Sequence, residues 1–248
     1  MFTAKLTPEE EANSKETIKI LRQADETDLT LKVDAALTEA VKQKEFDTES
    51  GFYAIPGMSG KKYRYFINRL IGSLSDARYL EVGSWAGSTL CSAINGNRVR
   101  AVAIDNWSQY GGPRRAFLEN LEAFTTPEAD VTFIESDFRD VDYGKLASKF
   151  NVYLYDGPHM RTDQYDGLAM AMPALDDQFV FIVDDWNWHA VRGGTLEAID
   201  KCGLSILYAA SIRTTADGLH ADHNSGKESN WHNGYFITVL LKGKTVGA

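Results

Sequence analysis

The feature that most constrains the fold is an alternation of short apolar runs and helical stretches that begins near residue 78. Five runs of five to seven residues are each followed by a segment with helical spacing. The runs are residues 78–83, 99–105, 131–136, 152–156 and 179–184. Short runs separated by helices predict βαβ units and a parallel sheet with helices on both faces.

The pattern changes toward the end of the chain. The helices expected between or after the runs lie near 87–95, 114–124, 142–149, 163–172 and 190–201. Two further strands, 204–212 and 234–241, are then joined by a polar segment without a helix. We therefore expect a Rossmann-like, doubly wound α/β fold whose mostly parallel, seven-stranded sheet has an antiparallel last strand.

The first 50 residues have a helical pattern instead. Residues 7–10, Thr-Pro-Glu-Glu, match a capping box, and apolar side chains recur every four residues from Leu29 to Val41. This composition predicts an N-terminal helical extension over 1–50, followed by one catalytic domain over 51–248. Ser59 is expected to cap the next helix, whose apolar face is Tyr63, Phe66, Ile67, Leu70 and Leu74.

Composition excludes several classes of protein. The net charge of −9 comes without a basic stripe, so we expect no nucleic-acid partner. No apolar run approaches the length of a membrane span, and the N-terminus lacks the pattern of a signal peptide, which predicts a cytoplasmic protein. Cys91 and Cys202 are too few for a disulfide framework or a zinc site.

Polar residues gather at the ends of the predicted strands. In such sheets ligands bind beyond the carboxyl ends of the strands, where the strand order reverses. The residues at or just past these ends are Gly83, Asp105, Asp137, Asp156, Asp184 and Asp185. The sequence therefore predicts one shared site at this edge of the sheet.

A glycine turn opens the first βα unit. Gly83 and Gly87 in "YLEVGSWAGST" have the spacing E-x-G-x-x-x-G, which suits a nucleoside with a small zwitterion better than a pyrophosphate. Asp105, 22 residues after Gly83, can accept hydrogen bonds from the hydroxyls of a ribose, and Asp137 can accept one from an exocyclic amine. A generic βα turn and two helix caps are the structural alternatives.

The order of these motifs resembles class I S-adenosylmethionine (SAM) dependent methyltransferases. The resemblance spans roughly residues 52–241 and includes "AIDNW", "ESDF" and "YDGPH". It implies that Gly83 and Gly87 line the methionine part of SAM, that Glu81 supports the turn, and that Ser88 or Thr89 reaches the carboxylate. The full cofactor set implied is Ser59, Glu81, Gly83, Gly87, Ser88, Thr89, Asp105, Asn106, Trp107, Ser136, Asp137, Phe138 and Asp156.

Three carboxylates, Asp156, Asp184 and Asp185, should converge from two neighbouring strands. Hard oxygen ligands in such a group suit Mg²⁺ or a similar divalent cation, whereas without a cation they would raise each other's pKa. This part of the chain resembles the metal-dependent O-methyltransferases of the catechol and macrocin types. In the alternative, Asp184 binds a substrate without metal and Asp185 caps the next helix.

The same resemblance implies transfer of a methyl group to a hydroxyl of a sugar, macrolide or phenol-like molecule. His159, three residues after Asp156, is the expected general base, with His189 in reserve. The catechol type has a lysine at that place, so a histidine that only binds a loop carbonyl is the alternative. Trp186, Trp188 and His189 are expected to face the acceptor.

The connection over 213–233 holds His220, His223 and His232. We expect it to wall the acceptor pocket rather than to bind metal. A hydroxylase-type relative and a non-catalytic SAM-binding or sugar-binding module are the competing functions, and the glycine spacing argues against a nicotinamide dehydrogenase. Homo-oligomerisation stays open.

Overall fold

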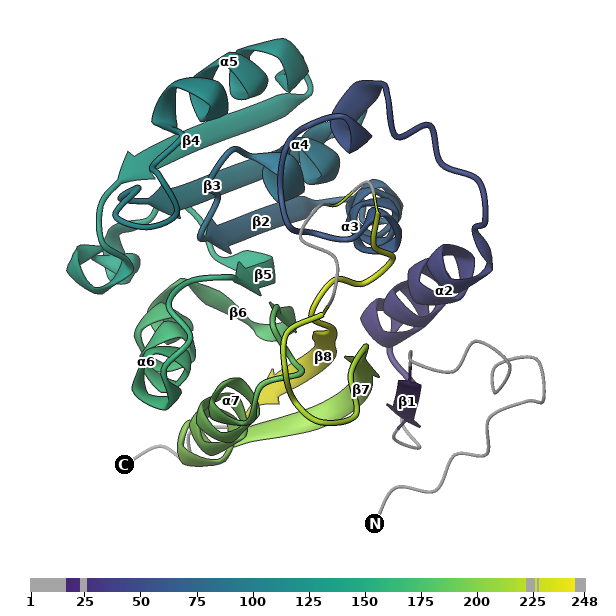
Figure 1. Ribbon diagram of the computed structural model, residues 1–248. Helices are drawn as coiled ribbons and strands as arrows, with labels where there is room; N and C mark the ends of the chain where they lie inside the picture. Colours follow the sequence, from purple (N-terminus) through teal and green to yellow (C-terminus); the bar gives the residue numbers. More distant parts are fainter. Residues whose placement is uncertain (1–16, 23–25, 222–225, 227, 244–248) are drawn as a thin grey trace.

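One eight-stranded sheet organises the protein (Figure 1). The computed structural model describes residues 17–22, 26–221, 226 and 228–243, so the expected capping box at 7–10 and His223 lie outside it. The strand order is β1-β7-β8-β6-β5-β2-β3-β4. The strands are β1 (Thr17–Arg22), β2 (Ala77–Val82), β3 (Val99–Asp105), β4 (Ala129–Glu135), β5 (Phe150–Tyr155), β6 (Leu175–Val183), β7 (Leu204–Arg213) and β8 (Tyr235–Lys242).

The parallel α/β class is confirmed, and the last strand is antiparallel as expected. β8 is inserted between β6 and β7 and runs antiparallel to both. The chain builds β2, β3 and β4 in one direction, then returns to place β5 beside β2. Strand order therefore reverses between β2 and β5, and a ligand site is expected beyond the carboxyl ends of these strands.

Helices cover both faces of the sheet (Figure 1). One core lies beneath α2 (Asp28–Lys42), α3 (Lys61–Ser73), α4 (Ser88–Ile94) and α5 (Arg114–Phe124). The other lies beneath α6 (Arg161–Ala171) and α7 (His189–Lys201). Short 3-10 turns occupy η1 (Gly51–Tyr53), η2 (Phe138–Asp140), η3 (Tyr143–Lys145) and η4 (Met172–Ala174). No helix among the described residues is long and apolar enough to cross a bilayer.

Two helix predictions were wrong. The segment 142–149 contains only η3, because Gly144 has a low helix propensity and the next strand begins at Phe150. Ser59 is not the cap of α3: the N-cap is Gly60, without a side-chain hydrogen bond, and Ser59 binds other groups described below. The predicted apolar face of α3 is confirmed, since Phe66 and Leu70 are fully buried.

The N-terminal region is not wholly helical. α2 forms as its apolar spacing predicts, with a Thr27 capping box, and buries Val33 and Leu37. Thr17–Arg22, however, is the edge strand β1, which pairs antiparallel with β7 and raises the strand count from seven to eight. The alternation of Ile18 and Ile20 with Lys19 was the available signal.

Candidate functional site

A cleft opens beyond the carboxyl ends of β2, β3, β5 and β6, where the strand order reverses. Most residues predicted for the site line it. They are Ser59, Gly83, Ser88, Thr89, Asp105, Asn106, Ser136, Asp137, Phe138, Asp156, His159, Asp184, Asp185 and Trp188. The expectation that the six strand-end residues share one edge of the sheet is therefore confirmed: Gly83, Asp105, Asp137, Asp156, Asp184 and Asp185 all line the cleft.

Glycine is required at position 83 by close packing. Its φ is +89°, and a Cβ at this position would lie 1.9 Å from the carbonyl oxygen of Asp156. Its N–H donates to the Ile104 carbonyl at 2.9 Å, while the Asp156 N–H donates to Val82 at 2.9 Å. The turn after β2 is thus pressed against the start of the loop after β5, which brings the two halves of the site together.

Asp105 fixes the shape of the turn. Its Oδ2 accepts the N–H of Trp85 at 2.7 Å and its Oδ1 accepts the N–H of Trp107 at 2.6 Å. Both tryptophans have positive φ values, 46° and 47°. Tyr110, Asp185 and His232, in other loops around the cleft, also have positive φ. Backbone strain of this kind persists where the surroundings hold it, and it is common at functional sites.

Asp137 both caps a helix and lines the cleft. Its Oδ1 accepts the N–H of Arg139 at 3.0 Å at the start of η2. Its Oδ2 accepts an amide hydrogen of Asn106 at 3.2 Å.

The three expected carboxylates lie together at the other side of the cleft. Asp184 and Asp185 are 5% and 7% exposed. Burial and the neighbouring charges of Asp184 and Asp185 raise the pKa of Asp156 well above its usual range. Burial and the charge of Asp185 likewise raise the pKa of Asp184. Burial acts in the same direction on Asp185, but His159 and Asn233 outweigh it and hold the pKa of Asp185 below its usual value.

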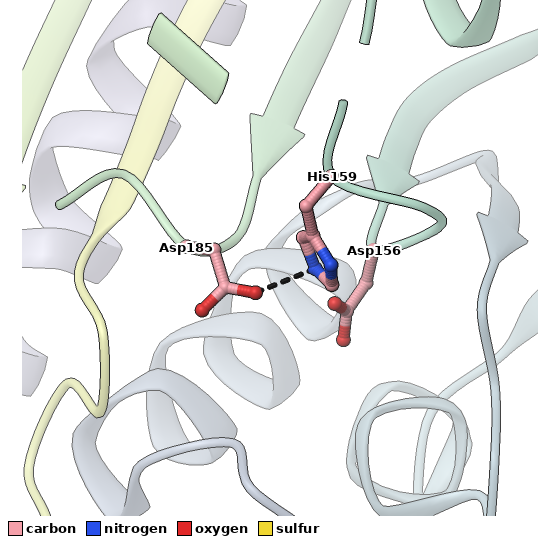
Figure 2. Close-up of side chains that lie close together, drawn as sticks. All are labelled: Asp156, His159 and Asp185. Carbon is pink, nitrogen blue, oxygen red and sulfur yellow. Dashed lines mark ion pairs between the residues drawn. The ribbon is translucent and has the colours of Figure 1, made fainter. Parts of the chain in front are cut away.

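His159 belongs to this cluster. Figure 2 shows His159 facing Asp185, with Asp156 beside it, and Nε2 of His159 lies 2.5 Å from Oδ2 of Asp185. Ligand atoms of Asp156, His159 and Asp185 all lie within 4.8 Å of one another. Among the described residues this metal-ligand group contains His159 where the sequence predicted Asp184.

Asp184 is held by its own surroundings. Its Oδ1 accepts the N–H of Asp185 at 2.7 Å, and its Oδ2 accepts the hydroxyl of Tyr235 at 3.3 Å. It still lines the cleft.

The connection between β7 and β8 walls this side of the cleft, as expected. Asn233, fully buried, donates an amide hydrogen to Oδ1 of Asp185 at 2.5 Å and lies 3.1 Å from Nε2 of His220. The rings of His159, Trp188 and His220 follow one another edge to face, with centroids 5.0 and 5.5 Å apart. Asn233 therefore joins the wall to the acidic cluster.

Residues 80–186 match the profile of a family described as a methyltransferase domain. This segment, which is less than half of the chain, is similar to a methyltransferase domain. It contains the glycine turn, Asp105 and the acidic cluster, so the resemblance to SAM-dependent methyltransferases is confirmed, and with it the expectation of an enzyme. No curated protein matches the chain in sequence.

Several solved structures are similar at low identity. An O-methyltransferase from Bacillus cereus, solved in complex with SAH, is 13% identical, with a TM-score of 0.49 over 88% of this chain and 93% of that one. A precorrin 8W decarboxylase from Methanobacterium thermoautotrophicum is 14% identical, with a TM-score of 0.49 over 77% and 94%. TrmN from Thermus thermophilus is 14% identical, with a TM-score of 0.48 over 73% of this chain but only 48% of its own length.

Some residues predicted for the methyltransferase site do not line the cleft. Trp186 is 3% exposed, stacks on Phe236 at 4.3 Å and donates its Nε1–H to Ser211, so it packs the core rather than facing an acceptor. His189 is exposed at the start of α7, where its Nδ1 lies 3.0 Å from Nη2 of Arg192.

Three further predicted residues, Gly87, Trp107 and Glu81, are also outside the lining of the cleft. Gly87, with φ of +86°, packs against Phe117 at the start of α4. Trp107 donates its Nε1–H to the Trp85 carbonyl at 2.9 Å. Glu81 is fully buried, and burial raises its pKa to about 7 against the lowering effect of the hydrogen bond from the Tyr79 hydroxyl.

Sequence reasoning missed a further set of cleft residues. They are Gly57, Met58, Val82, Ser84, Trp85, Ile104, Ser108, Gln109, Tyr110, Gly157, Pro158 and Asn233, whereas His220 and His232 belong to the connection that was expected to wall the cleft. The glycines and serines beside predicted site residues could have been found by proximity in sequence. Asn233 gave no local signal, because its partner Asp185 is 48 positions away.

Proposed function

We propose that the protein transfers the methyl group of SAM to a hydroxyl of a small molecule, with Mg²⁺ or a similar divalent cation held beside the acceptor. A sugar, macrolide or phenol-like molecule is the proposed acceptor class. The observation that carries the proposal is that one cleft combines the glycine turn with a buried acidic cluster.

The donor set fits a hard cation. Carboxylate oxygens are the ligands that Mg²⁺ prefers, and a cation among them would remove the repulsion that raises the pKa of Asp156 and Asp184. We assign Asp156 and Asp185 as ligands, with the third position shared between Asp184, the sequence-based choice, and His159. When bound, the cation would lower the pKa of an acceptor hydroxyl and favour its negative charge.

The opposite side of the cleft is assigned to SAM, which supplies a methyl group on a sulfonium. Gly83, Ser88 and Thr89 line the region proposed for the methionine end. Asp105 accepts one backbone N–H on each oxygen, and each oxygen has a second lone pair for a ribose hydroxyl. Asp137 is proposed for the adenine amine. These residues bind and orient the donor.

His159 is proposed to take the proton of the acceptor hydroxyl on Nδ1, because Nε2 already faces the carboxylate of Asp185 at 2.5 Å. That carboxylate would hold the ring hydrogen on Nε2 and stabilise the imidazolium that results. Trp188 contacts the His159 ring at its edge and would limit its rotation. In-line displacement would require the methyl group of the donor and the acceptor oxygen to be held in one line by these two sides of the cleft.

Calorimetric titration with SAM and S-adenosylhomocysteine (SAH) is the first test, and absence of binding to both would refute the proposal. Binding of Mn²⁺, followed by electron paramagnetic resonance, should be lost in Asp185→Asn and kept in Asp140→Asn, an exposed control. SAH affinity should survive in both variants.

Two variants separate the roles of His159. If His159→Gln keeps Mn²⁺ affinity but loses turnover, His159 is the base. If it loses Mn²⁺ affinity while Asp184→Asn does not, His159 is a ligand.

A further inference from the structure

A buried arginine lies directly behind the cleft. Arg64, in the first turns of α3, is 1% exposed. Its side chain donates to a series of backbone carbonyls in the segment before the helix. These acceptors are Phe52, Tyr53 and Ile55 at 2.9–3.1 Å from Nη1, Gly57 at 3.3 Å from Nη2, and Ser59 at 3.2 Å from Nε. The segment 52–59 is therefore wrapped around the guanidinium.

The positive charge of Arg64 has no counter-charge in the part of the chain that the structure describes. No aspartate or glutamate there forms an ion pair with it, and every acceptor is a neutral oxygen. Burial lowers the pKa of Arg64 to about 10, so the group still carries its charge near neutral pH. Carbonyls satisfy the N–H groups but do not neutralise the charge, and a buried charge without a partner is costly.

Ser59 connects this charge to the cleft. Its Oγ accepts the Nε–H of Arg64 at 3.0 Å and lies 3.1 Å from Oγ of Ser88. Both serines are buried and line the cleft, whereas Arg64 does not line it. Because Ser59 accepts a hydrogen bond from a cation, its own hydroxyl hydrogen is a stronger donor toward an anion in the cleft.

Close packing fixes the distance between the charge and the cleft. A Cβ at Gly57 would lie 2.3 Å from Oγ of Ser88 and 3.2 Å from Nη2 of Arg64. Oγ of Ser88 and Nη2 of Arg64 therefore both lie beside the position that a side chain at Gly57 would occupy, which places them close to each other. An anion that contacts the two serine hydroxyls would feel the charge of Arg64 through a region of low dielectric.

We propose that Arg64 is a positioning residue that supplies the counter-charge for the carboxylate of the cofactor's methionine end, acting through the hydroxyls of Ser59 and Ser88. This proposal rests on the proposed function, because it requires SAM in the cleft. It assigns recognition of the donor's anion to a residue outside the matched segment 80–186. Selection for a carboxylate then distinguishes SAM and SAH from nucleosides that lack the amino-acid portion.

The test compares two ligands that differ in the carboxylate. SAH carries it, and 5′-methylthioadenosine shares the adenosine and the sulfur but lacks it. Dissociation constants for both are measured by calorimetry with the wild type, Arg64→Gln, Arg64→Lys and Ser59→Ala. Arg69→Gln is the matched control, since Arg69 is on the same helix but is exposed and pairs with Glu39.

Arg64→Gln should weaken SAH at least about tenfold and methylthioadenosine less than about twofold. Arg64→Lys, which keeps the charge, should retain most of the preference for SAH, and Arg69→Gln should change neither ligand. Equal losses for both ligands would show that Arg64 only folds the segment 52–59, and would overturn the proposal.

If Arg64→Gln does not fold, Ser59→Ala decides. A loss confined to SAH supports the proposal, whereas equal losses or no change overturn it. A wild type that binds neither ligand refutes the proposed function itself, and a wild type that binds both equally well refutes only the role of Arg64.

Discussion

Replacement of Glu81 by glutamine should make the protein more stable than the wild type at neutral pH, by a difference that grows as the pH rises. Glu81 is fully buried behind the glycine turn, and its pKa is raised from 4.5 to about 7, chiefly by burial. Below pH 4.5 the group is protonated in both the folded and the unfolded state. Above pH 7 it is charged in both, and the folded state then bears the cost of the buried charge.

The magnitude follows from the shift. A difference of one pKa unit corresponds to about 1.4 kcal/mol, so the shift of Glu81 corresponds to about 3 kcal/mol. The pKa of Glu81 is higher in the folded state than in the unfolded state. The wild type therefore has its full stability below pH 4.5 and loses about 3 kcal/mol of its free energy of unfolding as the pH rises to about 7. Glutamine keeps the shape and cannot ionise, so the variant does not undergo this loss.

Urea unfolding at intervals from pH 4.5 to 8, with a chelator present, measures the effect. The free energy of unfolding of Glu81→Gln minus that of the wild type should grow by about 3 kcal/mol up to pH 7 and then level off. Losses from Asp156 and Asp184, whose pKa values are also raised, occur in both proteins and largely cancel in the difference.

Glu128→Gln, at an exposed glutamate, controls for the change in net charge. A difference between Glu81→Gln and the wild type that stays constant across the whole range would refute the reasoning. It would mean that hydrogen bonds from the surrounding hydroxyls fully compensate the buried charge of Glu81.

Three further predictions concern the site. Gly83→Ala should lower the free energy of unfolding by more than about 3 kcal/mol, because the added Cβ would lie 1.9 Å from the Asp156 carbonyl oxygen. The melting temperature should fall accordingly, and a value within about two or three degrees of wild type would contradict the close packing. Trp186→Phe should cost about 1–3 kcal/mol in urea unfolding while the acceptor KM stays unchanged, and a raised KM would restore Trp186 to the acceptor pocket. Dialysis against a chelator should abolish turnover without weakening SAH, and full activity after dialysis would exclude the divalent cation.

Much of the site could be predicted because parallel strands bring their carboxyl ends to one edge. Asp105, Asp156 and Asp185 were assigned to strand ends from short apolar runs, and the fold places all of them in one cleft. The prediction required only the alternation of strands and helices. It did not require knowledge of side-chain packing.

Side-chain direction within loops could not be predicted in the same way. Trp186 follows Asp185 directly, but the positive φ of Asp185 turns the chain there and sends the indole into the core against Phe236. Asn233 reaches Asp185 only because β8 is inserted beside β6. Both outcomes depend on tertiary contacts that local spacing does not encode. The same holds for Arg64. It is buried and Arg69, on the same helix, is exposed, but the residues around them in the sequence do not indicate which of the two arginines is buried.

β1 gives the N-terminal region a role in keeping the molecules apart. Pairing with β1 occupies the outer backbone groups of β7 from Tyr208 to Arg213, so that the edge of the sheet is the six-residue β1, which carries Lys19, and not the ten-residue β7. The opposite edge, β4, is shorter than β7 and carries Asp130 and Glu135, which discourage pairing with another chain. A shortened protein that began after Arg22 would leave β7 open along its length, and a second copy could add a strand there. Attempts to trim this protein for crystallisation should therefore stop before Thr17. Cutting further would remove β1 and leave the longer strand β7 with unpaired backbone groups, to which another chain could bind.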